Sequence, residues 1–416
     1  MEVKPGYKQT EVGVIPEEWS IYRLRDVAHI QRGASPRPID AAVWYDSTST
    51  VGWVRISDVT ASDGKHLRST ADYFSKRGIA NSRYMPSGSL IMSICATVGM
   101  PVITFMDACI HDGFVGFTKL RQADQDFLYY KLKQLEPAFK AMGQTGSQAN
   151  LNSDLVRDCY IALPPHLEQR AIAEALSDAD ALIESLEQLL AKKRDLKQAA
   201  MQQLLTGQKR LPGFSGEWEI LIMAEKSTLK ARIGWQGLTT AEYLPTGEYY
   251  LVTGTDFVGG RVNWATCCFV DASRYVQDKN IQLKPRDILL TKDGTIGKVG
   301  FVDALPGPAT LNSGVFVIRP KGDAYDPLFF YYILTSRVFE DFLAQLQAGS
   351  TISHLYQKDF VNFRFRAPSV PEQTAIADVL SDMDAEIAAL EQRLAKTRAL
   401  KQGMMQELLT GRIRLV

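Results

Sequence analysis

The chain has 416 residues, 45% of them hydrophobic, which is enough for two or more globular domains and excludes a disordered chain. Lys and Arg together number 47, as do Asp and Glu, so composition alone does not point to nucleic acid. The first residues lack the apolar core of a signal peptide, and no apolar run approaches about 18 residues. We therefore expect a cytoplasmic protein without a membrane partner.

Cysteine and histidine usage predicts neither a disulfide framework nor a metal site. The five cysteines are odd in number and include no CxxC pair. The five histidines are not spaced as metal ligands.

Residues 1–165 are predicted to form a first domain of mixed strand and helix. Short runs rich in Val, Ile, Phe and Tyr alternate here with Gly, Pro and Asp. Leu90 to Gly99 reads as a strand entering a glycine-bearing turn, and Gly113 to Phe117 as another strand. Phe127 to Tyr130 opens an amphipathic helix.

Residues 166–210 are predicted to form one long helix. Its apolar residues alternate in steps of three and four, which is typical of a coiled-coil seam: Ile172, Leu176, Ala179, Ile183, Leu186 and Leu190. Pro164 and Pro165 mark its start, and Gly207 marks its end. Lys193 and Lys197 interrupt the seam, either as a simple stutter or because this end splays to dock another subunit.

Residues 211–370 repeat the first domain weakly and in the same order. Ile288 to Gly297 matches the first strand and turn, Gly314 to Ile318 the next strand, and Phe329 to Tyr332 the helix start. We expect a second domain of the same kind.

Residues 371–416 repeat the long helix. Glu372 to Leu415 aligns with Glu168 to Leu211 without a gap, 204 residues later, and about two-thirds of the positions are identical. Thr397 and Lys401 interrupt this seam as well. The predicted fold is α+β, with two pseudo-repeated mixed α/β domains separated by two long antiparallel coiled-coil helices.

Motifs of catalysis are lacking. Lys292 to Lys298 is glycine-rich but does not have the GxxxxGK[ST] spacing of a phosphate-binding loop. HExxH, GxSxG and GxGxxG motifs do not occur. Glu168 and Glu372 recur in a first helical turn, where a carboxylate complements the helix dipole. We predict no catalytic residue in this chain.

The layout resembles the specificity subunit of type I DNA restriction-modification systems over almost the whole chain. The resemblance rests on the segment from Lys8 to Trp19, the AIAxxLSDxD helices that begin at Ala171 and Ala375, and the two LLTGxxRL endings. It implies two target-recognition domains, each reading one half of a split site in double-stranded DNA. It also implies that the helices set the spacing and bind two methyltransferase subunits.

The resemblance further implies that S-adenosylmethionine belongs to the methyltransferase and that this chain holds no cofactor. The sequence leaves open whether a restriction subunit, an ATP-dependent translocase and nuclease, joins the complex. Since the chain is neutral, we expect partner subunits to supply the cationic clamp on DNA. Two other classes stay open: a coiled-coil scaffold that binds proteins, and a diverged DNA methyltransferase or nuclease.

Candidate base readers are polar residues in glycine-flanked loops, because base edges are read by such side chains. In the first domain they are Gln31, Arg32, Ser35, Arg37, Arg55, Ser57, Gln144, Ser147, Gln148 and Asn150. In the second domain they are Trp235, Gln236, Thr253, Thr255, Lys292, Asp293, Ser350, Thr351, Ser353 and His354.

Overall fold

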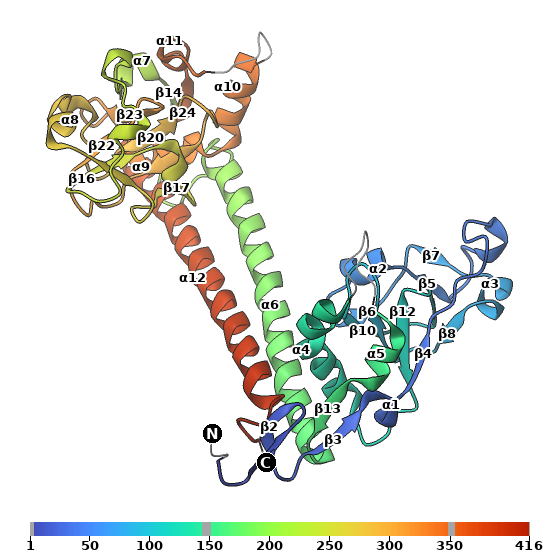
Figure 1. The fold of residues 1–416 in the computed structure, drawn as a ribbon. Coiled ribbons are helices and arrows are strands. Elements are labelled where there is room, and N and C mark those ends of the chain that lie inside the picture. The colour runs from blue at the N-terminus through green and yellow to red at the C-terminus, as the bar shows by residue number, and fades with distance from the viewer. Residues whose placement is uncertain (1–3, 144–150, 348–353, 416) are drawn as a thin grey trace. The chain divides into compact units, whose positions relative to one another are not determined.

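A computed structural model describes residues 4–143, 151–347 and 354–415. The chain divides into two compact units. Unit 1 combines residues 1–187 with 392–416, and unit 2 is residues 188–391. We call the mixed α/β part of unit 1 (residues 20–163) the first head and that of unit 2 (residues 219–367) the second head (Figure 1).

The first head is built from two sheets around a shared core. One sheet has the order β4–β12–β9–β10–β6, with β4 His29–Arg32, β12 Phe114–Thr118, β9 Leu90–Ser93, β10 Pro101–Thr104 and β6 His66–Leu67. The other has the order β7–β5–β11–β8, with β7 Asp72–Tyr73, β5 Gly52–Val54, β11 Ala108–Ile110 and β8 Arg83–Met85. Val54, Ile91 and Ile110 belong to one buried cluster that joins the two sheets.

The second head repeats this arrangement. Its larger sheet has the order β15–β23–β20–β21–β18–β17, with β15 Ser227–Ala231, β23 Val315–Pro320, β20 Ile288–Thr291, β21 Val299–Phe301, β18 Arg261–Val262 and β17 Phe257–Val258. Its smaller sheet has the order β19–β16–β22, with β19 Cys268–Val270, β16 Tyr249–Val252 and β22 Ala309–Leu311. In both heads the smaller sheet contains a parallel pair of strands distant in sequence, β5 with β11 and β16 with β22.

A two-stranded antiparallel pair connects each head to its long helix. In unit 1 it is β3 (Ser20–Arg23) with β13 (Tyr160–Leu163), and in unit 2 it is β14 (Glu219–Ile222) with β24 (Arg364–Ala367). The short helices α1 (Leu24–Val27) and α7 (Met223–Lys226) follow the first strand of each pair. The two halves of the chain therefore share one core topology, which confirms the predicted fold. They differ at sheet edges, where β8 extends the smaller sheet of the first head and β17 the larger sheet of the second.

The Glu-Gln pair that opens each long helix also holds its head. The side chain of Gln169 accepts a hydrogen bond from the backbone N–H of Asp124 at 2.7 Å, and Asp124 caps α4 (Gln125–Met142). In unit 2 the same bond runs from the Asp326 backbone N–H to Gln373 at 2.9 Å, and Asp326 caps α9 (Pro327–Leu334). A capping aspartate satisfies the free N–H groups of a first helical turn.

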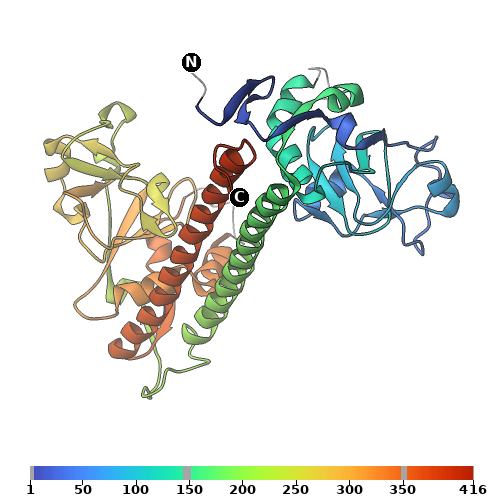
Figure 2. The ribbon, with the colours of Figure 1, turned by 90° about the horizontal axis from the view of Figure 1, so that it is seen from below.

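The long helices are α6 (His166–Leu204) and α12 (Val370–Leu408). In unit 1 the first half of α6 packs its apolar seam against the last turns of α12, and in unit 2 the first half of α12 packs against the last turns of α6 (Figures 1 and 2). The pairing is therefore antiparallel in each unit. Gly207 and Gly411 end the helices with φ of 73° and 72°, as predicted. No helix within the described ranges is long and apolar enough to cross a membrane.

The polar residues that interrupt the seam form contacts at the helix pair. Lys193 pairs with Glu386 at 2.6 Å, and Lys197 pairs with Asp384, both within unit 2. In unit 1, Lys401 pairs with Asp180. The helices stay in contact at these positions through ion pairs, where a plain coiled coil would place apolar side chains.

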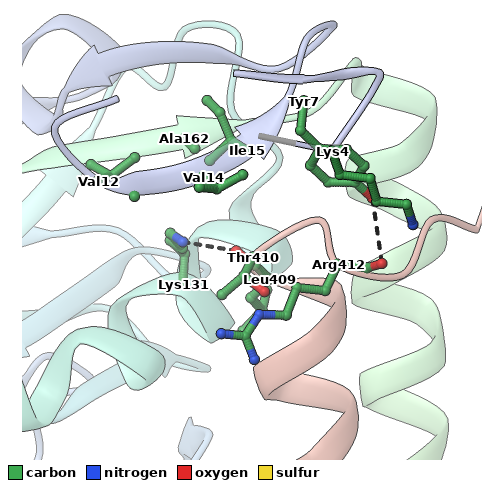
Figure 3. Close-up of a pocket in the computed structure, with 11 residues that line it drawn as sticks. Lys4, Tyr7, Val12, Val14, Ile15, Lys131, Ala162, Leu409, Thr410 and Arg412 are labelled. Atoms are coloured by element: carbon green, nitrogen blue, oxygen red, sulfur yellow. Dashed lines mark hydrogen bonds between the residues drawn. The ribbon is translucent and has the colours of Figure 1, made fainter. Parts of the chain in front are cut away.

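The start of the chain closes unit 1 over the end of α12. The hairpin of β1 (Tyr7–Thr10) and β2 (Gly13–Pro16) lies on this end, and the Tyr7 hydroxyl donates to the Gly411 carbonyl at 3.0 Å. Lys131 of α4 donates to the Leu409 carbonyl at 2.8 Å. Figure 3 shows these side chains around a cavity of about 500 Å³.

Candidate nucleic-acid interface

Three turns recur in both heads with the same backbone hydrogen bonds. The first turn follows β5 in the first head and β16 in the second, the strand of each parallel pair that comes first in the chain. In the first head the backbone N–H of Arg55 donates to the carboxylate of Asp58 at 2.7 Å. In the second head the backbone N–H of Thr253 donates to Asp256 at 2.8 Å. The scaffold is the same, but the side chain at its first position is a guanidinium in one head and a hydroxyl in the other.

The second turn follows β9 and β20. The hydroxyl of Ser93 accepts from the Met100 backbone N–H at 3.2 Å, and that of Thr291 accepts from Lys298 at 2.9 Å. Each hydroxyl also donates to a carbonyl inside its own turn. Gly99 closes the first of these turns with φ of 84°. Because these bonds make Ser93 and Thr291 equivalent, the residues two places later are equivalent as well. They are Cys95 in the first head and Asp293 in the second.

The third turn follows β11 and β22. The His111 ring accepts from the Gly113 backbone N–H at 2.8 Å, and the Asn312 side chain accepts from Gly314 at 2.5 Å. Burial lowers the pKa of His111, and its Nδ1 atom acts as an acceptor, so the ring is neutral with Nε2 as its donor.

The second and third turns are joined by a backbone hydrogen bond in each head, and the first turn lies beside the third because β5 pairs with β11 and β16 with β22. The backbone N–H of Ile94 donates to the Gly113 carbonyl at 2.8 Å, and that of Lys292 donates to Gly314 at 2.9 Å. In the second head the Lys298 amine also donates to the Gly254 carbonyl at 3.2 Å. We call the side chains around these turns the first site, in the first head, and the second site, in the second head.

Asp112 is at the centre of the first site, surrounded by three predicted readers. Its carboxylate accepts from the Ser35 hydroxyl at 2.7 Å, and its backbone carbonyl accepts from Arg32 Nε at 2.8 Å. Arg37 lies 3.5 Å from the carboxylate and is largely exposed. Burial works to raise the pKa of Asp112, but the bond from Ser35 and the nearby charges lower it below its ordinary value. The carboxylate is thus ionised and accepts from Ser35, while 45% of the Asp112 side chain stays exposed.

Arg55 borders the same site. It pairs with Asp72 at 2.7 Å, while 45% of its side chain stays exposed. Ser57 lies in the following helix α2 (Ile56–Ala61) and is exposed. The first site therefore presents guanidinium donors to solvent around one half-exposed carboxylate.

The second site is a cavity of about 590 Å³. It is lined by Tyr243, Thr253, Gly254, Thr255, Thr291, Asp293, Gly294, Thr295, Lys298, Asn312, Ser313 and Gly314. The hydroxyl groups of Thr253 and Thr255 lie 2.7 Å apart, and Thr253 also donates to Asp256 at 2.8 Å. The cavity is rich in hydroxyl groups, and the described residues that line it include no arginine.

Asp293 is the charged acceptor of the second site. Its carboxylate pairs with the His354 ring and, at 3.2 Å, with the Lys292 amine, yet 43% of the side chain is exposed. Lys292 is mostly covered and lies over the ring of Phe316, 5.9 Å from its centre. The structure thus brings Lys292, Asp293 and His354 together.

The other predicted readers lie elsewhere or outside the described residues. Gln31 precedes Arg32 on β4. Gln236 is 7% exposed, in the short helix η2 (Gly234–Gln236) that also contains Trp235. Seven predicted readers fall outside the described ranges: Gln144, Ser147, Gln148, Asn150, Ser350, Thr351 and Ser353.

Sequence reasoning missed several polar residues of these sites: His111, Asp112, Tyr243, Lys298, Asn312 and Ser313. A usable signal was present. Gly113 and Gly314 were aligned as strand starts, and the residues just before them differ between the two heads while the strands match. A turn that repeats its glycine but changes its polar residues marks a variable surface on a common scaffold.

A second duplicated feature lies where each head meets the helix pair. Unit 1 has a groove of about 650 Å³ and unit 2 one of about 840 Å³. Seven lining residues of the unit 1 groove have a counterpart 204 residues away in the other groove: Asp180, Ile183, Arg398, Lys401, Gln402, Met405 and Gln406. The counterparts are Asp384, Ile387, Arg194, Lys197, Gln198, Met201 and Gln202.

Comparison with known families gives one match over most of the chain. The family model described as type I restriction modification DNA specificity domain matches residues 16–192 and again residues 240–397. The two matches correspond to the two repeats.

Curated relatives have related descriptions. The MjaVIII specificity subunit of a type I restriction enzyme from Methanocaldococcus jannaschii is 25% identical over 306 residues, 70% of this chain and 71% of that protein. The putative MjaX specificity subunit from the same organism is 23% identical over 432 residues, 99% of this chain and 97% of that protein. The EcoBI specificity subunit from Escherichia coli is 24% identical, covering 69% of this chain and 65% of that protein.

Solved structures share the fold. The S subunit of a type I restriction-modification system from M. genitalium superposes with a TM-score of 0.62 at 14% identity, covering 98% of each chain. A chain from a structural study of complex assembly in the type I R-M system gives a TM-score of 0.57 at 17% identity, covering 96% of this chain and 99% of that one.

Proposed function

Because this chain belongs to the type I restriction-modification DNA specificity family, we propose that its two heads each read one half of a bipartite, asymmetric DNA site. One observation carries the proposal. Both heads have the same three turns with the same backbone bonds, but the turns bear different side chains, such as Arg55 against Thr253. A common scaffold with exchanged polar groups suits two readers of different base sequences.

The neutral charge of the chain fits a division of labour. Phosphate contacts provide most of the affinity of DNA-binding proteins, and they need many cationic side chains. With 47 basic and 47 acidic residues, the heads supply base contacts while partner subunits supply the cationic surface. The isolated chain should bind DNA weakly, and the complex tightly.

The duplicated grooves are the proposed docking sites of two methyltransferase subunits. A partner that recognises Gln402, Met405 and Gln406 in unit 1 finds Gln198, Met201 and Gln202 in unit 2. The heads differ, but these grooves repeat, so one kind of partner can bind twice. Helices of equal length then set the number of unread bases between the half-sites.

We place catalysis in the partners. Within the described ranges, no group of three His, Cys, Asp or Glu side chains is arranged to hold a metal ion. S-adenosylmethionine belongs to the methyltransferase in this proposal. A restriction subunit, where one joins, would bring its own ATP-dependent activity.

Reading is tested on the complex with its methyltransferase, by selecting bound sequences from a randomised DNA library. Wild type should select two short motifs with a fixed gap. A triple variant with Ala at Thr253, Thr255 and Asp293 should lose selection of one motif and keep the other. A variant with Arg32 and Arg55 replaced should lose the motif that the triple variant keeps. Wild-type complex without any sequence preference would reject the proposal in favour of a protein scaffold.

Docking is tested by filling each groove. Gln202→Trp and Gln406→Trp each place a large ring on an exposed groove position. Native mass spectrometry should show one bound methyltransferase with either variant and two with wild type. Gln203→Trp, exposed but outside the groove, is the matched control. Two bound copies in both groove variants would place docking elsewhere.

A further inference from the structure

The two sites differ in the groups that they offer to a base. The first site exposes the guanidinium groups of Arg37 and Arg55, beside an Asp112 carboxylate that accepts from the Ser35 hydroxyl. The second site has no arginine among its described lining residues, and it exposes the Asp293 carboxylate, which pairs with Lys292 and His354. This contrast can be followed to the bases themselves, on the premise that the heads read DNA as proposed above.

Positions that correspond in the two heads show an exchange of donor and acceptor. Where the second turn of the first head has Cys95, the second head has Asp293. The Cys95 thiol points to the Gly113 carbonyl at 3.7 Å, and burial raises its pKa, so it remains a neutral thiol. Where the first turn has Arg55, the second head has Thr253, whose hydroxyl is bound to Asp256. Relative to the first head, the second head thus has an acceptor at the position of Cys95 and lacks the guanidinium donor at the position of Arg55.

Asp293 can bind only donors, because an ionised carboxylate has no proton to give. Phosphate oxygens repel it, so contact with the DNA backbone is unfavourable. In the major groove the only base donors are the amino groups of cytosine N4 and adenine N6. The pairs to His354 and Lys292 fix the orientation of the carboxylate without covering it. Its position thus selects a base that presents an amino group in the major groove, cytosine or adenine.

Arginine has the opposite preference. A guanidinium donates two parallel hydrogen bonds, and the matching pair of acceptors in the major groove is O6 and N7 of guanine. Arg32 is anchored by a bond from its Nε to the Asp112 carbonyl, and Arg55 by its ion pair with Asp72 and a bond to the Tyr45 hydroxyl at 3.4 Å. The anchored groups retain further N–H donors for a base. The first site therefore suits guanine.

We infer that the two heads read bases of opposite hydrogen-bonding character. The first head reads guanine through Arg32 or Arg55, and the second head reads the exocyclic amino group of cytosine or adenine through Asp293.

Selection from a randomised library with the methyltransferase complex tests this inference. Asp293→Leu keeps the approximate shape but removes both acceptor oxygens, and it should reduce the preference at one cytosine or adenine by about 5- to 150-fold. The other half-site should not change. Asp323→Leu, at an exposed aspartate beyond the opposite end of β23, is the control and should leave both half-sites intact.

Arg55→Met and Arg32→Met complete the test on the first head. One of them should relax a guanine in the other half-site, whereas Arg25→Met, half-exposed beside Asp158, should not. A uniform loss of affinity with a smaller salt dependence would show phosphate contact instead and overturn the guanine reading. Relaxation of a guanine or thymine by Asp293→Leu, or no change, would overturn the reading by Asp293. Either result leaves the two selected motifs of wild type in place, so the proposed function stands or falls separately.

Discussion

Asp180 of α6 binds two partners at once: its carboxylate accepts the Tyr130 hydroxyl at 2.7 Å and forms an ion pair with Lys401 of α12. Tyr130 belongs to the head helix α4, so one carboxylate joins the head, its own long helix and the opposite helix. The Lys401 amine also lies 5.7 Å from the centre of the Tyr130 ring.

Unit 2 has the same triad 204 residues later. Asp384 accepts the Tyr332 hydroxyl at 2.8 Å and pairs with Lys197. The triads explain two repeated features at once, the final aspartate of the LSDxD motif and the lysine that interrupts each seam. A polar group at a seam position specifies the register of a coiled coil at some cost in stability.

The first prediction concerns the coupling within the unit 1 triad. Thermal unfolding of Asp180→Ala, Lys401→Ala and the double variant should give a coupling energy of about 0.5 to 2 kcal/mol, since both side chains are mostly covered. The same cycle on Glu187 and Arg398, an ion pair with both side chains about half exposed, should give less than about 0.5 kcal/mol. Equal coupling in the two cycles would show that burial at the triad has no energetic effect.

The second prediction concerns the buried carboxylate at the start of α6. Glu168 is fully buried, pairs with Arg414 at 2.5 Å and accepts the Trp19 indole N–H at 3.1 Å. Removing one partner of a buried pair leaves an uncompensated charge, so Glu168→Ala should cost about 3 to 5 kcal/mol and lower Tm by roughly 10 °C. Glu18→Ala removes an exposed partner of the same arginine and should change Tm by less than about 3 °C. Similar losses in both variants would contradict this account.

The third prediction is a pH dependence from Lys131. Burial lowers the pKa of Lys131 to about 8 from its ordinary 10.5. Between these pH values the folded protein binds fewer protons than the unfolded chain, so the contribution of this group to stability rises with pH. The gain is about 1.4 kcal/mol per pH unit within the window. Tm of wild type relative to Lys131→Met should therefore increase from pH 7.5 to pH 9.5, and a constant difference would count against it.

The fourth prediction uses two glycines of the second repeat. Gly403 lies inside α12 with open space around it, and its counterpart in α6 is Ala199. Gly403→Ala should stabilise by about 0.5 to 1 kcal/mol, because alanine favours the helix. Gly411→Ala should destabilise, since φ is 72° and the new Cβ would lie 2.5 Å from a Pro16 side-chain atom. Calorimetry should show Tm shifts of opposite sign.

Local features of this fold were predictable from sequence because short-range patterns determine them. The glycines after each Leu-Leu-Thr take the left-handed conformation that ends a helix. Glycine-bearing turns follow β9 and β20, as expected, and the hydroxyl groups of Ser93 and Thr291 close them. The duplicated topology followed from the repeat itself.

Long-range partners were not predictable in the same way. The pairing of Asp180 with Lys401, 221 residues apart, depends on the register of two antiparallel helices, and a repeat alone does not give that register. Glu168 had a sufficient local explanation in the helix dipole, so nothing pointed to Arg414. The sites were only partly predicted, because Asp112 and Asn312 lie in turns whose convergence depends on strand order.

Unit 1 is built from two segments that are distant in the sequence, and this affects how the chain can fold during synthesis. Unit 2 is one continuous segment, residues 188–391, and can assemble as soon as it has left the ribosome. Unit 1 begins first but lacks residues 392–416 until all of unit 2 has been made. Domains usually form in the order in which they are made. Here the first-made part waits longest, with Glu168 and the first half of α6 exposed to chaperones and proteases until residues 392–416 follow.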